Sequence, residues 1–176
     1  MKKTFLFLLP LVATALVGCK GGNNAGSSSE EPEAFKPKEG VNYHLAINQE
    51  GIEGKPTIYL KDEVPESNPW YLKSSRNVSD AATVTVHYSG DTFKIQVGTH
   101  YLQHKLSNSK LSNFLVAEEE ATEYSWDADR EQFYATVNNA SGDPKQVTSG
   151  TYSTYESVSC QYLDASNAYF VKFVAA

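Results

Sequence analysis

Short runs of alternating apolar and polar residues constrain this chain to a fold built from β-strands. In the runs that start at Tyr43, Phe93 and Phe133, an aromatic residue comes first and apolar residues follow at every second position. A period of two indicates a strand with one buried face. The acidic stretch Glu118 to Ala121 is too short to nucleate a helix, so we expect an all-β domain. The twelve runs read YHLAIN, PTIYLK, WYLKSS, ATVTVHY, TFKIQV, THYLQH, NFLVAE, TEYSWDA, QFYATV, QVTSGTY, SVSCQYL and AYFVKFV.

The twelve runs fall into three units of four. The units start near Tyr43, Thr92 and Gln132, so the first two periods are 49 and 40 residues. Three units of four strands are typical of a β-trefoil, although the same spacing also fits a β-sandwich or another β-barrel. We predict a β-trefoil-like domain over residues 41–176, with the sandwich and the other barrel as alternatives.

Several motifs then resemble a trefoil-like module of Gram-positive surface and secreted proteins. They are Gly54-Lys55-x-x-Ile58-Tyr59-Leu60, Asp80-Ala81, Trp126-Asp127 and the closing run Gly150 to Ser159, which is the most specific of them. The resemblance spans nearly the whole domain. It implies a module that is appended to secreted nucleases and other extracellular proteins or stands alone on a lipid anchor. It implies no activity for the module itself.

The amino end has the pattern of a bacterial lipoprotein signal. Lys2 and Lys3 precede an apolar stretch from Phe5 to about Leu16, and the run Leu16-Val17-Gly18 leads to Cys19. Such a stretch is too short for a retained membrane span and ends in a small-residue cleavage site. We predict a signal peptide over residues 1–18 and lipidation of Cys19, which would hold the protein on the extracytoplasmic face of the cell membrane. The alternative is an ordinary secretory signal that is cut elsewhere.

Residues 19–40 are predicted to be a lipidated flexible tether. Gly, Asn, Ser, Glu, Lys and Pro dominate this stretch, and Phe35 is its single aromatic residue. Such a composition buries too little apolar surface to offset the entropy of ordering. A coil of about 20 residues spans about 25 Å on average, so the tether would hold the domain away from the bilayer.

The net charge limits the classes of partner that the domain can bind, and the cysteine content limits its disulfides. The chain has 15 Lys and Arg against 21 Asp and Glu, and removal of Lys2 and Lys3 with the signal leaves a net charge of about −8. That balance argues against nucleic acid and against direct binding to anionic lipid. Cys160 is the only cysteine left for the domain, so no internal disulfide is expected. On a strand, Cys160 should be a small buried hydrophobe.

No residue pattern in the chain supports catalysis or a cofactor. His100 and His104 lie on one predicted strand, where four residues at about 3.3 Å each separate them too far for a shared metal ion. Ser157 and Ser159 have no convincing base and no nucleophile elbow around them. We therefore expect no enzyme activity, no metal and no cofactor.

The alternating acids Asp127, Asp129 and Glu131 come nearest to a calcium loop. The turn glycine of such a loop is missing, and Arg130 brings an opposing charge. A solvated hairpin turn is therefore expected here.

The aromatic residues carry the remaining functional prediction. Tyrosine and tryptophan rings stack on the apolar faces of sugars. We assign Trp70 and Trp126 mainly to the core, and we name Tyr155, Tyr152 and Trp126 as candidate ligand-binding residues. The predicted function is a noncatalytic binding module for carbohydrate or cell-wall polymer. The alternative is an accessory or structural lipoprotein that acts through contacts with a surface protein.

Overall fold

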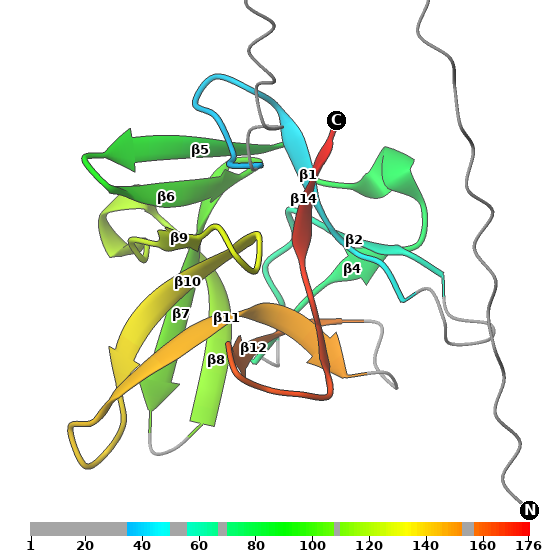
Figure 1. Cartoon of the computed structure of the whole chain (residues 1–176). Helices are drawn as coiled ribbons and strands as arrows, with labels where there is room; N and C mark the ends of the chain where they lie inside the picture. Colours follow the sequence, from blue (N-terminus) through cyan, green and yellow to red (C-terminus); the bar gives the residue numbers. More distant parts are fainter. Residues whose placement is uncertain (1–34, 50–55, 67–69, 108–109, 153–156) are drawn as a thin grey trace, which may run out of the picture. The chain divides into compact units, whose positions relative to one another are not determined.

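The computed structural model of this chain describes residues 35–49, 56–66, 70–107, 110–152 and 157–176 (Figure 1). β-Strands make up the regular structure of these ranges, apart from two 3-10 turns at Val78–Asp80 and Glu118–Glu120. The prediction of an all-β domain is confirmed. The second 3-10 turn lies in the acidic stretch that is too short for an α-helix. Within these ranges, no helix is long and apolar enough to span a bilayer.

Eight strands form the first antiparallel sheet. Their bounds are β1 (Tyr43–Ile47), β2 (Ile58–Leu60), β4 (Ser74–Ser75), β5 (Val84–Ser89), β6 (Thr92–Val97), β7 (His100–Ser107), β8 (Lys110–Val116) and β14 (Lys172–Ala175). The order across the sheet is β4-β2-β1-β5-β6-β7-β8, and β14 pairs with β1 as an additional neighbour. The chain therefore pairs its first strand with its last, Tyr43 opposite Ala175.

Six strands form the second antiparallel sheet. Their bounds are β3 (Tyr71–Leu72), β9 (Ser125–Asp127), β10 (Gln132–Asn138), β11 (Pro144–Tyr152), β12 (Val158–Tyr162) and β13 (Ala168–Phe170). The order is β3-β12-β11-β10-β9, and β13 also pairs with β11. A bridge between Phe93 of β6 and Tyr124 joins the two sheets. The described strands thus form two sheets and not one closed barrel.

The three predicted unit starts coincide with strand starts. β1 begins at Tyr43, β6 at Thr92 and β10 at Gln132. Each of the twelve predicted runs overlaps one or two of the observed strands. Apolar alternation therefore located the strands well, because each of these strands turns one face toward the core.

Aromatic rings from all three units meet in one core. Tyr43, Phe93 and Phe133 are buried at their strand starts. The Phe173 ring lies 5.4 Å from that of Tyr43 and 5.8 Å from that of Phe133. Tyr124 lies 6.3 Å from Phe93 and 5.1 Å from Phe133. Burial of each such side chain stabilises the fold by about 1.5 to 3 kcal/mol, so the repeated aromatic positions hold the three units together.

The described residues before the predicted boundary at Val41 contact the domain. Residues 35–40, which we call the N-terminal segment, were predicted to belong to the disordered tether. The Phe35 ring lies 5.8 Å from that of Trp126, and its carbonyl accepts a hydrogen bond from Trp126 Nε1 at 3.1 Å. The Tyr88 hydroxyl donates to the Pro37 carbonyl at 2.7 Å. One aromatic residue with a matching surface is enough to order a stretch whose composition favours disorder.

The two tryptophans differ in placement. Assignment of Trp70 to the core is wrong, because this side chain is 39% exposed and the Lys110 ammonium lies 4.3 Å above its ring. Trp126 is half-buried and packs against the core, with its ring 6.2 Å from Phe173. The prediction for Cys160 is confirmed. It is a buried free thiol on β12, and burial raises its pKa to about 12.

Candidate functional site

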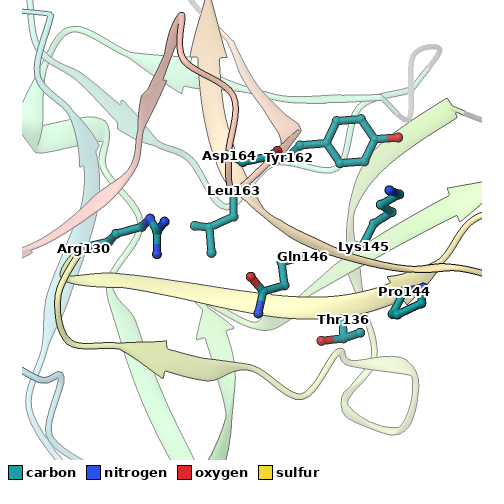
Figure 2. Close-up of a pocket in the computed structure, with 8 residues that line it drawn as sticks. All are labelled: Arg130, Thr136, Pro144, Lys145, Gln146, Tyr162, Leu163 and Asp164. Atoms are coloured by element: carbon teal, nitrogen blue, oxygen red, sulfur yellow. The ribbon is translucent and has the colours of Figure 1, made fainter.

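A polar cleft in the second sheet is the best candidate for a ligand site (Figure 2). Its volume is about 420 Å³. Small-molecule sites commonly occupy about 300 to 1,000 Å³. The lining residues come from the β9–β10 turn, β10, β11 and the end of β12, and they are Arg130, Thr136, Pro144, Lys145, Gln146, Tyr162, Leu163 and Asp164.

The β9–β10 turn holds Arg130 at one end of the cleft. Asp127 accepts hydrogen bonds from the Arg130 backbone N–H at 3.0 Å and from Arg130 Nη1 at 2.6 Å. Partial burial opposes ionisation of Asp127, but these Arg130 contacts hold its pKa below the usual value. The Lys172 ammonium donates to the carbonyls of Arg130 and Glu131 at 2.7 and 3.0 Å. Lys172 therefore holds the backbone of the turn, and Asp127 holds the Arg130 guanidinium.

The β10–β11 turn positions the other end. Asn139 Oδ1 accepts hydrogen bonds from the backbone N–H groups of Ser141 and Asp143 at 2.9 and 2.8 Å. Gly142 follows with a φ of 85°, a conformation that glycine adopts without strain. This closed turn starts β11 at Pro144 and places Lys145 opposite Val137 of β10.

The base of the cleft is apolar and its walls are polar. Leu163 is 5% exposed, and its N–H donates to the Gln146 carbonyl at 3.0 Å, which continues the β11–β12 pairing beyond Tyr162. In Figure 2, Arg130 and Leu163 lie on one side of Gln146, and Lys145 and the Tyr162 ring lie on the other. The cleft is therefore elongated, with a cation at each end.

Most polar side chains of the cleft are free to bind a ligand. Within the described part of the chain, no hydrogen-bond or ion-pair partner is found for the side chains of Thr136, Lys145, Gln146, Tyr162 and Asp164. Together they offer an ammonium donor, a carboxylate acceptor, and hydroxyl and amide groups that both donate and accept. Such a mixed set suits a ligand with many hydroxyl groups.

Of the three predicted ligand residues, the structure describes the side chain of Trp126 alone, and Trp126 is not among the described residues that line this cleft. Tyr155 lies outside the described residues. The backbone of Tyr152 ends β11 opposite Ala168, but the structure does not describe the Tyr152 side chain. Trp126 uses its indole N–H to bind the Phe35 carbonyl. Ligand binding by these three residues therefore stays a prediction.

The sequence pattern did not identify Tyr162 as a site residue, because the alternation along its strand suggests a buried side chain. It follows Val158 and Cys160 at intervals of two, so the sequence pattern places it on their buried face. In the structure β12 ends at Tyr162, where the side chain is 36% exposed. At the end of a strand, the alternation of apolar and polar residues no longer predicts which side chain is buried.

A second polar cluster is buried inside the domain. His104 Nε2 lies 2.8 Å from Ser149 Oγ, and the Tyr124 ring stands edge-on to the imidazole at 5.2 Å. Burial lowers the pKa of His104 to about 3, so the imidazole is neutral. Serine and histidine at this distance occur in hydrolases, but His104 and Ser149 are only 3% and 1% exposed. A substrate cannot reach Ser149 without opening the domain.

The other titratable groups considered as ligands take structural roles. His100 and His104 share β7, as the strand prediction requires. His100 Nδ1 lies 2.6 Å from Asp62 Oδ1, and the Thr99 N–H donates to Asp62 Oδ2 at 2.9 Å. Partial burial opposes ionisation of Asp62, yet the contacts with Thr99 and His100 lower its pKa. These bonds fix the segment after β2 to the β6–β7 turn.

The stretch Asp127 to Glu131 forms the predicted hairpin turn between β9 and β10. Arg130 already engages both oxygens of Asp127. Among the described residues, no three His, Cys, Asp or Glu side chains gather in a group that could hold a metal ion.

Comparisons of the chain with protein-family models, with curated proteins and with solved structures gave no match. Its function therefore has to be inferred from its own residues.

Proposed function

We propose that this chain is a noncatalytic binding module for carbohydrate or cell-wall polymer, and that the polar cleft of the second sheet is its binding site. The single observation that supports the proposal most is the set of five unpartnered polar side chains around the cleft. All five side chains are exposed, and no other described side chain occupies their donors and acceptors, so a ligand can bind to them. A concave group of five that offers both donors and acceptors resembles the walls of sugar sites.

The rest of the cleft supports the same ligand class. Leu163 supplies an apolar base, and the exposed Tyr162 ring provides a face on which a pyranose can stack. Asp164 can accept hydrogen bonds from sugar hydroxyls, and Gln146 can both donate and accept. Cleavage of a glycosidic bond generally requires a pair of carboxyl groups, and among the described residues that line the cleft Asp164 is the one carboxylate.

Binding to a glycan and wall-polymer panel by the full-length chain tests this proposal. We expect saturable binding that Tyr162→Ala weakens and that Gln146→Ala also weakens. Asp91→Asn, a control change at an exposed turn between β5 and β6, should leave binding unchanged. If the folded protein retains no polymer of the panel, the carbohydrate proposal fails. The alternative, an accessory or structural lipoprotein that works through protein contacts, would then replace it.

We also propose that Cys19 carries the lipid that anchors the protein to the extracytoplasmic face of the cell membrane. Support comes from the charged amino end, the apolar stretch and the run that leads to Cys19. Metabolic labelling with a fatty-acid analogue provides the test. Cys19→Ser should abolish the label, and Cys160→Ser should retain it, since Cys160 is buried in the domain. Labelling that survives Cys19→Ser would refute the anchor.

A β-trefoil is our proposal for the finer fold. β1 pairs with β5, β5 with β6 and β9 with β10, while β6 meets the start of β9 through the Phe93–Tyr124 bridge and β14 returns to β1. These contacts follow the order expected around a six-stranded trefoil barrel. A β10–β14 ladder would close the ring. Amide and Hα NOEs between β10 and β14 would support closure, and their absence in an assigned spectrum would leave an open pair of sheets.

A further inference from the structure

We propose that the polar cleft prefers an extended anionic polymer, with phosphate or carboxylate groups spaced along it, over a neutral one. This inference rests on the proposed carbohydrate-binding function and adds the charge and length of the ligand. The shared chemistry is an oxyanion on each repeat of a hydroxyl-rich chain. Two cations at opposite ends of the cleft carry the inference.

The two cations lie far apart along one strand. Arg130 precedes the first residue of β10, Gln132, and Lys145 lies opposite Val137 near the other end of that strand. Five residues of strand span about 17 Å at 3.3 Å per residue. Figure 2 shows the same arrangement, with Arg130 and Lys145 on opposite sides of Gln146. A single sugar cannot contact both ends, whereas consecutive repeats of a polymer can.

Both cations retain capacity for an anion. The Lys145 ammonium has no partner in the described residues. Arg130 uses Nη1 for Asp127, so most of its five N–H donors stay available. The Asp127 contact also holds the guanidinium in place, which reduces the entropy lost when an oxyanion binds. Lys172 adds a third positive charge beside the Arg130 backbone.

The acidic groups near the cleft do not cancel this preference. Asp127 is already paired with Arg130, and Asp164 alone remains as an unpaired carboxylate among the lining residues. The turns beside Arg130 and Lys145 also carry Asp129, Glu131 and Asp143, but among the described residues that line the cleft the two cations outnumber the one carboxylate. The lining cations therefore favour contact with an oxyanion at the two ends of the cleft, although the whole chain has a net charge of −6.

A second cavity of the domain does not have more cations than carboxylates in its described lining. It has a volume of about 270 Å³ and is lined by residues that include His87, Lys94, Glu118 and Glu123. Its two glutamates outnumber the one lysine, and the Lys94 ammonium already donates to the Glu118 carbonyl at 3.1 Å. An anion would be repelled there, so the polar cleft is the better place for the anionic polymer.

Affinity measurements with three polymers test the inference on the full-length chain. The probes are polygalacturonate for carboxylate, poly(glycerol phosphate) for phosphate and dextran as a neutral polymer. We expect one or both anionic polymers to bind more tightly than dextran at low salt and to weaken as salt rises. Lys145→Gln should weaken anionic binding about two- to fivefold, the range of an exposed ion pair. Lys105→Gln, at an exposed position on β7, is the matched control and should have no effect.

The outcomes separate this inference from the function on which it rests. If dextran binds with the same affinity as the anionic polymers and salt does not change these affinities, the charge preference is overturned and the carbohydrate site remains. Anionic binding that Lys105→Gln weakens as much as Lys145→Gln does would also overturn it, because the charge effect would then be general. Binding of none of the three polymers by folded protein would overturn both proposals.

Discussion

Acid should destabilise this domain through His104 before its carboxylates contribute. In the folded state burial holds the pKa of His104 at about 3, and in the unfolded chain an ordinary histidine has a pKa of about 6.5. Below pH 6.5 His104 therefore binds a proton in the unfolded state but not in the folded state. Stability is unaffected by His104 above that value and falls as the pH drops from about 6.5 toward 3.

The size of this effect follows from the two pKa values. At pH 5.0 the unfolded imidazole is about 97% protonated and the folded one is neutral, which costs about 2 kcal/mol relative to pH 7.5. That is a large part of a typical stability of about 5 to 15 kcal/mol. Tyr124 and Cys160 face the same cluster, but burial raises both pKa values, so neither ionises in this range. Asp62, Glu63 and Asp127 have lowered pKa values and lose their stabilising charge only in stronger acid.

Urea unfolding at pH 7.5, 6.0 and 5.0, followed by tryptophan fluorescence, measures the loss. The comparison is a double variant, His104→Leu with Ser149→Ala, which removes both partners of the buried hydrogen bond together, so that neither is left without the other. The wild type should lose about 2 kcal/mol more than the double variant between pH 7.5 and 5.0. Equal losses would refute the reasoning, because they would mean that His104 titrates alike in the folded and unfolded states.

Three further predictions concern stability and reactivity. Gly98→Ala should cost about 1.5 to 3 kcal/mol more than Gly90→Ala in urea unfolding. Both glycines have positive φ, but only at Gly98 does an added Cβ meet Asp62, 2.2 Å from Oδ2, and equal costs would contradict this placement. Cys160 should react with a thiol reagent only after denaturation, since it is buried with a pKa of about 12, and rapid labelling of native protein would contradict its burial. Phe133→Ala should lower the free energy of unfolding by about 3 to 5 kcal/mol, and a loss below 1 kcal/mol would place Phe133 outside the core.

Patterns of neighbouring residues predicted the fold better than the site. Tyr43, Phe93 and Phe133 could be identified as strand starts because the repeat places an aromatic residue before each buried face. Trp70 could not be placed in the same way. Trp70 precedes the short strand β3, and its ring is exposed beneath the Lys110 ammonium. The sequence alone does not indicate this exposure, because a large apolar side chain in a strand-like run is usually buried.

The candidate site depends on contacts between distant parts of the sequence. Arg130, Lys145 and Tyr162 come from separate turns and strands, and only the register between β10, β11 and β12 brings them together. His104 and Ser149 likewise lie on different sheets. No spacing rule connects such residues, because their proximity is decided by how the sheets pack.

The pairing of β1 with β14 has a consequence for how the chain is made. Leu45 faces Phe173 across this pair, so β1 finds this partner only after synthesis has passed residues 172–175. A chain that stops before residue 172 would leave one edge of β1 open to other molecules. β14 therefore protects an edge of β1 that would otherwise be open to pairing with other molecules.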